Sequence, residues 1–171
     1  MALRKIVTLG DEALRKECKK VDKFNLRLHL LLKDMLDTMY EANGVGLAAP
    51  QVSILRRVVV IDVGEGPVEL VNPEIIWTSD EIQTGTEGCL SLPGRVGIVS
   101  RPEKVRVRAQ DRHGNWFEIE GEDLMARALC HELDHLDGRL YIDTMERELV
   151  GEELEQYRQG SLDEESEEET E

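Results

Sequence analysis

The sequence predicts a fold that combines helices with a β-rich middle. Two observations predict it: helical patterns at residues 25–43 and 122–137, and a run of short, valine-rich strands between them. The length of 171 residues, 40% hydrophobic and 33% charged, is typical of one globular domain with a substantial core. We expect a single domain over residues 1–158 and a separate acidic tail over residues 159–171.

The first long helix is expected at residues 25–43, after a short helical piece between Asp11 and Lys20. Asp22 or Asn25 caps its start, and Gly44 ends it in a left-handed conformation. Leucine and methionine recur at helical spacing and form a buried stripe: Leu28, Leu31, Leu32, Met35, Leu36 and Met39.

The middle of the chain predicts strands separated by turn residues such as the Gly-Glu-Gly-Pro of residues 64–67. A hairpin loop is expected at residues 111–115. The predicted strands are residues 57–63, 68–72, 74–83, 96–99, 104–110 and 116–120.

The second long helix carries apolar residues around most of its surface, which is typical of a buried helix, and Gly138 ends it. Residues 139–145 are expected to be extended or irregular. A last helix is predicted at residues 146–158, weakened by Gly151.

The formal net charge is −15, and the last thirteen residues hold seven acidic side chains and no basic one. The rest of the chain still carries −8. This charge opposes general binding to nucleic acid or anionic membranes, and the composition of residues 159–171 predicts disorder.

Three cysteines, Cys18, Cys89 and Cys130, stand in a chain without a secretory signal or an apolar run of membrane-spanning length. An odd number of thiols is typical of a reducing compartment, so we expect a cytoplasmic protein.

The second long helix contains His-Glu-Leu-Asp-His at residues 131–135. His131 and His135 lie one turn apart on one face, so both imidazoles reach one metal ion. Glu132 lies about 100° further round, where it acts on a metal-bound water as general base or acid. Because buried polar groups need partners, a metal explains two histidines on a buried helix.

Two further segments leave alternatives open on their residues alone. Residues 44–51 read either as a packed connection or as a close approach of backbone to ligand, and they lack the lysine and hydroxyl of a phosphate loop. Cys89 is either a small buried hydrophobe or a thiolate ligand. His29 and His113 are expected at the surface without a metal role, and Cys130 in packing.

Taken together, three segments resemble the peptide deformylase family: Gly-Val-Gly-Leu-Ala-Ala-Pro-Gln at residues 44–51, Glu-Gly-Cys-Leu-Ser at residues 87–91, and His-Glu-Leu-Asp-His at residues 131–135. The likeness covers about residues 5–145. It implies an α+β fold, with antiparallel or mixed β-sheets around a central helix that bears the H-E-x-x-H motif, a helix in the N-terminal half and a C-terminal helix.

The resemblance also implies the activity and the metal. The chain would remove the formyl group from N-formylmethionine of newly made polypeptides and release formate. Cys89, His131 and His135 would hold one divalent metal with water as fourth ligand, and Glu132 would be the general base and acid. Fe²⁺ is the ion implied in the cell, while ligand softness alone also allows Zn, Ni or Co.

Carried over by position, Gln51 and the backbone N–H of Leu90 would stabilise the oxyanion. Gly46 would contact the substrate backbone, and three residues would line the methionine pocket: Val45, Leu124 and Ala128. The expected partners are N-formylmethionyl nascent peptides. The chain is expected to be a monomer that binds neither nucleic acid nor membranes.

Two other functions compete with this hypothesis. The first is a zinc metallopeptidase, which shares the H-E-x-x-H motif. The second is a binding protein that a metal stabilises, which would have the metal ligands but catalyse no reaction. Two features depart from the family pattern: Cys130, where glutamine is common, and the acidic tail, which RNA would repel.

Overall fold

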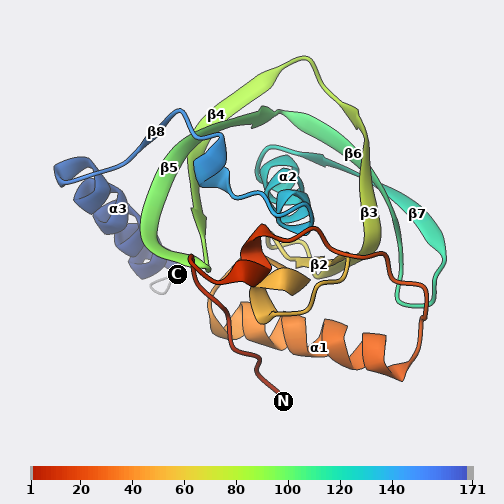
Figure 1. The fold of residues 1–171 in the computed structure, drawn as a ribbon. Coiled ribbons are helices and arrows are strands. Elements are labelled where there is room, and N and C mark those ends of the chain that lie inside the picture. The colour runs from red at the N-terminus through yellow and green to blue at the C-terminus, as the bar shows by residue number, and fades with distance from the viewer. Residues whose placement is uncertain (1, 169–171) are drawn as a thin grey trace.

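The computed structural model describes the backbone of residues 2–168 and the side chains of residues 2–160. Its fold is α+β. Helix α2 (Leu124–Leu136) lies between two sheets that curve around it, and helix α1 (Leu26–Glu41) packs below the larger sheet (Figure 1). The antiparallel pairing of every named strand confirms the antiparallel form of the prediction.

The larger sheet has the strand order β1-β2-β3-β6-β7, and the smaller one β4-β5-β8. The strands of the larger sheet are β1 (Gly46–Ala48), β2 (Val58–Ile61), β3 (Val68–Thr78), β6 (Lys104–Gln110) and β7 (Trp116–Glu122). Those of the smaller sheet are β4 (Ile82–Cys89), β5 (Leu92–Pro102) and β8 (Arg147–Glu148).

Strand β2 is buried on both faces, which explains why it is four apolar residues without alternation. Successive side chains of a strand point to opposite faces. Val58 and Val60 pack in the cluster that contains α1, and Val59 and Ile61 pack in the cluster that contains α2. The strand therefore joins the two helices through one core layer.

Helix α1 starts as predicted at Asn25, whose side chain accepts a hydrogen bond from Leu28 N at 3.2 Å. The predicted end is wrong in one detail. Asn43, not Gly44, takes the left-handed conformation, with φ of 56°. Asparagine tolerates this region, and Gly44 N then donates to Met39 O at 2.9 Å to close the helix.

Gly138 follows α2 with φ of +71°, as the prediction of a glycine at this helix end requires. The position is also crowded, because a Cβ there would lie 2.6 Å from the carbonyl oxygen of Arg15. The short helix η1 (Glu12–Arg15) thus packs against the end of α2, and Cys18 N donates to Leu136 O at 2.8 Å.

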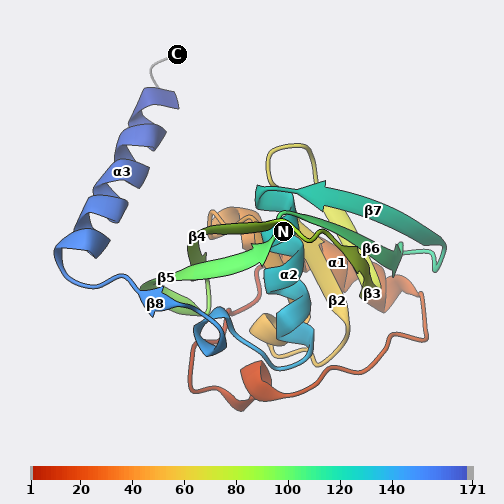
Figure 2. The same ribbon diagram turned by 90° about the horizontal axis from the view of Figure 1, so that it is seen from above.

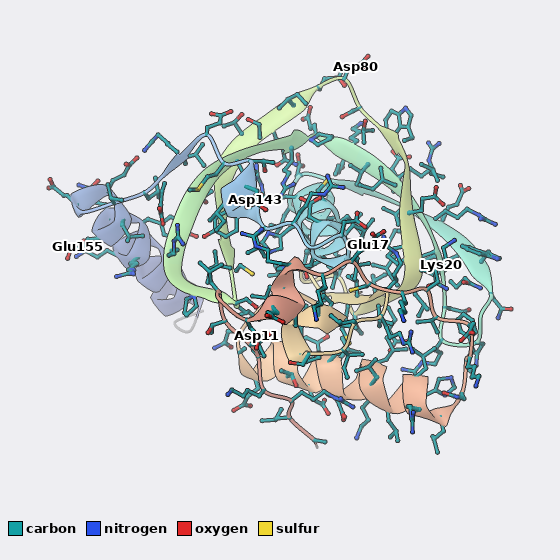
Figure 3. The ribbon with its side chains drawn as sticks, viewed as in Figure 1. Asp11, Glu17, Lys20, Asp80, Asp143 and Glu155 are labelled. Carbon is teal, nitrogen blue, oxygen red and sulfur yellow. The ribbon has the colours of Figure 1, made fainter. Side chains whose placement is uncertain are left out.

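The predicted division into strands 68–72 and 74–83 is wrong. Strand β3 runs through Asn72, which adopts φ of 51° where the pairing with β6 shifts register. Its side chain accepts from Val21 N and donates to Val21 O, both at 2.8 Å, which stabilises the irregularity. The turn to β4 follows Thr78, with Asp80 at its tip (Figure 3).

The C-terminal helix begins later than the predicted residue 146. Residues 147–148 pair with β5 instead, and Gly151 has φ of +60°, outside the helical region. Helix α3 (Glu152–Glu168) follows and projects away from the body (Figure 2), with Glu155 on its outer side (Figure 3). Helix α3 includes residues 159–168 of the tail for which disorder was predicted, and residues 169–171 lie outside the described residues. The disorder of the tail stays a prediction, as does the domain boundary at residue 158.

Across residues 2–168, none of the helices has the length and apolar content that would carry it through a bilayer.

Replacing Leu32 by alanine should destabilise the protein by about 2–5 kcal/mol, because its side chain is fully buried between α1 and the larger sheet. Leu30→Ala on the same helix is the matched control, since Leu30 is 50% exposed and its loss should cost under about 0.5 kcal/mol. Urea unfolding of both variants measures the difference, and equal midpoints would contradict the described core.

Candidate metal centre and active site

Side chains from two segments that are distant in the sequence meet at one point. Helix α2 presents His131 and His135, and the end of β4 presents Cys89. One ligand atom of each lies within 4.8 Å of the other two, and no other such group of three forms within the described residues. The Cys89 Sγ and His135 Nε2 atoms are 3.4 Å apart.

The donor atoms fit a tetrahedral metal. Ordinary metal–sulfur and metal–nitrogen bonds of about 2.3 and 2.1 Å place two ligand atoms about 3.6 Å apart, close to the Cys89–His135 distance. His131 Nδ1 lies 2.7 Å from Glu87 Oε1, which leaves His131 Nε2 for the cluster. A hydrogen bond from the ring nitrogen that does not face the metal is how proteins fix the tautomer of a ligating imidazole. Burial lowers the pKa of His135 well below its usual range and favours the neutral, ligating form.

The Glu87 carboxylate is buried and fully paired. Arg101 Nη2 donates to Oε1 at 2.7 Å and Arg127 Nη1 to Oε2 at 2.7 Å, beside the His131 contact. Burial raises the pKa of Glu87, but the hydrogen bonds and charges of His131 and Arg101 outweigh it and lower that pKa from 4.5 to about 2. Glu87 is therefore ionised at neutral pH. Glu87 begins the Glu-Gly-Cys-Leu-Ser segment, but the sequence alone predicts no role for it.

Glu132 lies in a different environment. Its side chain is buried, its Oε1 is 3.7 Å from His131 Nε2, and its Oε2 has no hydrogen-bond partner. Burial raises the pKa of Glu132 to about 7, although the nearby His131 lowers it. A carboxyl with a pKa near neutrality both takes and returns a proton. Gly46 on β1 makes room for this side chain, because a Cβ at that position would lie 2.8 Å from Glu132 Cγ.

Gln51 lies in η2 (Ala49–Val52), directly after β1, in a segment whose residues alone left open a packed connection or a close approach to ligand. Its Oε1 accepts from Ala48 N at 2.9 Å, which fixes the orientation of the amide. Its Nε2 then donates to Ser91 Oγ at 3.1 Å and to Cys89 Sγ at 3.5 Å. The amide therefore points an N–H group into the cluster.

A cavity of about 540 Å³ opens over these groups and also includes Tyr157 of α3. Its walls include almost every residue predicted for the site: Val45, Gly46, Gln51, Cys89, Leu90, Leu124, Ala128, His131 and Glu132. His135 lies outside this lining. A larger hollow of about 730 Å³ beside the start of α1 has no cysteine or histidine in its walls, so the chemistry points to the smaller cavity.

The remaining histidines and cysteines lie elsewhere. The His29 and His113 rings contact each other, with centroids 5.3 Å apart. Cys18 and Cys130 are buried in the core cluster that contains α2, and burial raises the pKa of each thiol to about 11. Such thiols remain protonated, as expected of packing residues.

A Cys-His-His cluster with buried histidines, an adjacent glutamate and an open cavity is the arrangement of metal-dependent hydrolases. Comparison with known proteins narrows the class. The model of the polypeptide deformylase family matches residues 3–149. The chain is 60% identical over 158 residues to peptide deformylase of Caldicellulosiruptor bescii, covering 92% of this chain and 95% of that protein.

Peptide deformylase of Thermoanaerobacter pseudethanolicus is 57% identical over 159 residues, with 93% and 99% coverage. The crystal structure of peptide deformylase from Thermotoga maritima superposes with a TM-score of 0.83 at 43% identity, covering 85% of this chain and 99% of that one. The enzyme from Synechococcus elongatus, crystallised with actinonin, gives a TM-score of 0.81 at 40% identity, with 88% and 81% coverage.

The chain therefore belongs to the polypeptide deformylase family, whose members are hydrolases that remove the N-formyl group of nascent polypeptides. The resemblance inferred from residues 44–51, 87–91 and 131–135 is confirmed. Membership decides against the zinc metallopeptidase and against a binding protein without catalysis.

The free energy of unfolding of the metal-free protein should fall by roughly 3 kcal/mol as pH drops from about 4.5 to about 2, because the folded state holds Glu87 ionised. The stabilisation is present above the unfolded-state pKa and is lost as pH falls through the folded-state pKa.

Urea unfolding across this pH range measures the loss. Glu87→Gln should remove it, whereas Glu120→Gln, at an exposed ion pair with Arg106, should retain it. The same acid profile in wild type and Glu87→Gln would contradict the ionised state of Glu87.

Proposed function

We propose that Cys89, His131 and His135 hold one catalytic divalent metal, and that the central helix α2 carries the H-E-x-x-H motif for this purpose. The approach of these three donors within 4.8 Å is the single observation that supports the proposal most strongly. Fe²⁺ is the proposed ion in the cell, and Zn, Ni or Co would also suit the donor set.

When bound, a metal with these ligands and an open position supplies a Lewis acid that activates water near neutral pH. Glu132 is proposed to take the proton of the attacking water and deliver it to the amine that leaves. Its unpaired Oε2 and a pKa of about 7 suit both halves of this task.

The oxyanion formed at the formyl carbon would be stabilised by two donors, the Gln51 amide and the backbone N–H of Leu90. The bond from Ala48 N to Gln51 Oε1 holds the amide nitrogen toward the site before substrate arrives. Preorganised donors of this kind typically contribute about 10²–10³ in rate each.

The cavity would receive the formylated N-terminus, with Gly46 against the substrate backbone. Val45, Leu124 and Ala128 would line the methionine pocket. Their exposures of 45%, 50% and 5% support a pocket that has two open walls and one closed wall before substrate binds. Formate and a free amino terminus would be the products.

The catalytic domain is proposed to span residues 1–158 and to act as a monomer in the cytoplasm. N-formylmethionyl nascent peptides are the proposed partners, and the acidic charge of the chain opposes binding to nucleic acid or anionic membranes.

Glu132→Gln should keep the fold and the metal but lower deformylation by at least about 10²-fold, because the variant has no proton acceptor. Formate release from formyl-Met-Ala-Ser, with metal content of the same sample, measures both effects. Glu118→Gln on strand β7 is the control and should behave as wild type. Activity within a few-fold of wild type in Glu132→Gln would contradict the assigned base.

Cys89→Ala should lose metal during gel filtration, because two imidazoles alone remain as ligands. Cys130→Ala is a matched control, since this thiol is buried in packing and should leave the metal content unchanged. Full metal occupancy in Cys89→Ala, or loss in Cys130→Ala only, would refute the ligand assignment.

A further inference from the structure

Arg127 is a buried arginine whose charge the proposed chemistry does not use. It lies on α2 one turn before His131, in the wall of the site cavity, and is only 7% exposed. A buried guanidinium is costly unless it is paired and hydrogen-bonded. Its partners therefore indicate what it does.

The partners of Arg127 lead directly to the candidate metal centre. Nη1 donates to Glu87 Oε2 at 2.7 Å and to the carbonyl oxygen of Val99 at 3.0 Å. The other oxygen of the same carboxylate, Glu87 Oε1, lies 2.7 Å from His131 Nδ1. A continuous chain of contacts thus joins strand β5 to the imidazole through Arg127 and Glu87.

Arg101 holds the same carboxylate from another side but does not replace Arg127. It donates to both oxygens of the carboxylate, from Nη2 to Oε1 at 2.7 Å and from Nε to Oε2 at 3.1 Å, while its Nη1 donates to Asp134 at 2.8 Å. The contact from Arg127 is the shorter of the two on Oε2. Without it, the carboxylate keeps both hydrogen bonds from Arg101 but loses its shortest hydrogen bond on Oε2.

Gly85 provides the space in which the guanidinium lies. It is two residues before Glu87 on β4 and so shares its face of the strand. A Cβ at Gly85 would lie 3.3 Å from Arg127 Nη2, closer than ordinary contact. The guanidinium of Arg127 therefore occupies space that a side chain at position 85 would reach.

We propose that Arg127, lying against Gly85, is a positioning residue of the metal centre: it fixes Glu87 so that the imidazole of His131 presents Nε2 to the metal. The inference rests on the proposed function, because it assumes that His131 is a ligand. Outer groups that orient a ligating histidine typically change metal affinity by about 10–100-fold when they are removed.

The test compares Arg127→Met with wild type by two readouts. The first is the affinity for Co²⁺, from competition with a chromophoric chelator and from the Co²⁺ absorption spectrum. The second is kcat and KM for formyl-Met-Ala-Ser. Arg127→Met should bind Co²⁺ about 10-fold or more weakly with an altered spectrum, and kcat should fall while KM changes less than about two-fold. Arg127→Lys should recover part of the affinity, since an ammonium restores one donor.

Arg106→Met is the matched control, because it removes an exposed arginine paired with Glu120 on β6 and β7. It should leave Co²⁺ affinity, spectrum and kinetics unchanged. Wild-type affinity and spectrum in Arg127→Met would overturn the proposal. A raised KM with unchanged affinity would also overturn it, since Arg127 would then act only as a wall of the substrate cavity.

Gly85→Val tests the same arrangement while keeping the arginine, in case Arg127→Met does not fold. It should displace the guanidinium and weaken Co²⁺ binding, and combining it with Arg127→Met should add little. Unchanged affinity in Gly85→Val would count against the proposal. Failure of wild type itself to bind Co²⁺ would instead refute the proposed function, so the two failures are distinguishable.

Discussion

Helix α2 is buried on nearly every side, and the polar groups it carries must find partners inside the protein. This constraint organises the molecule. The larger sheet covers the helix through Val59 and Ile61, and the smaller sheet brings Glu87 and Cys89 to its other side. The buried Arg127 and His131 find complementary groups on β4 and β5, and His135 Nε2 lies 3.4 Å from Cys89 Sγ, whereas Glu132 keeps an unpaired oxygen.

The same constraint separates the two glutamates of the site. Glu87 accepts hydrogen bonds from two arginines and His131, so it stays ionised and acts as an anchor. Glu132 is equally buried but has an unpaired oxygen, and its pKa is raised to about 7. Two carboxyl groups placed in contrasting environments can take contrasting roles, one structural and one in proton transfer. The mechanism proposed for the site depends on this difference.

Much of the fold was predictable from local patterns. The stripe of Leu32 and Met35 predicted α1, and the apolar surface of residues 122–137 predicted α2. The predictions that were wrong concern features that tertiary contacts determine. Asn43 replaces Gly44 at the helix end, Asn72 keeps β3 continuous because it bonds to Val21, and residues 147–148 pair with β5 rather than starting a helix.

The candidate site shows the same limit. The spacing of His131 and His135 predicted their common face, because periodicity is local. The residues of β4 left Cys89 undecided between packing and ligation, and only the resemblance to a family joined it to the histidines. Glu87 and Arg101 received no role, since nothing in a strand pattern says what lies across it. Arg127 did carry a signal, because it is the one charged residue among the otherwise apolar residues 124–130 that precede His131 on the helix.

The central claim is that one thiolate and two imidazoles form a single metal site between β4 and α2. X-ray absorption at the zinc edge of stoichiometrically loaded protein tests it most directly. The account predicts one sulfur at about 2.3 Å and two imidazole nitrogens at about 2.0–2.1 Å, with lighter scatterers completing four ligands. A first shell without sulfur, or with two sulfurs, would contradict it.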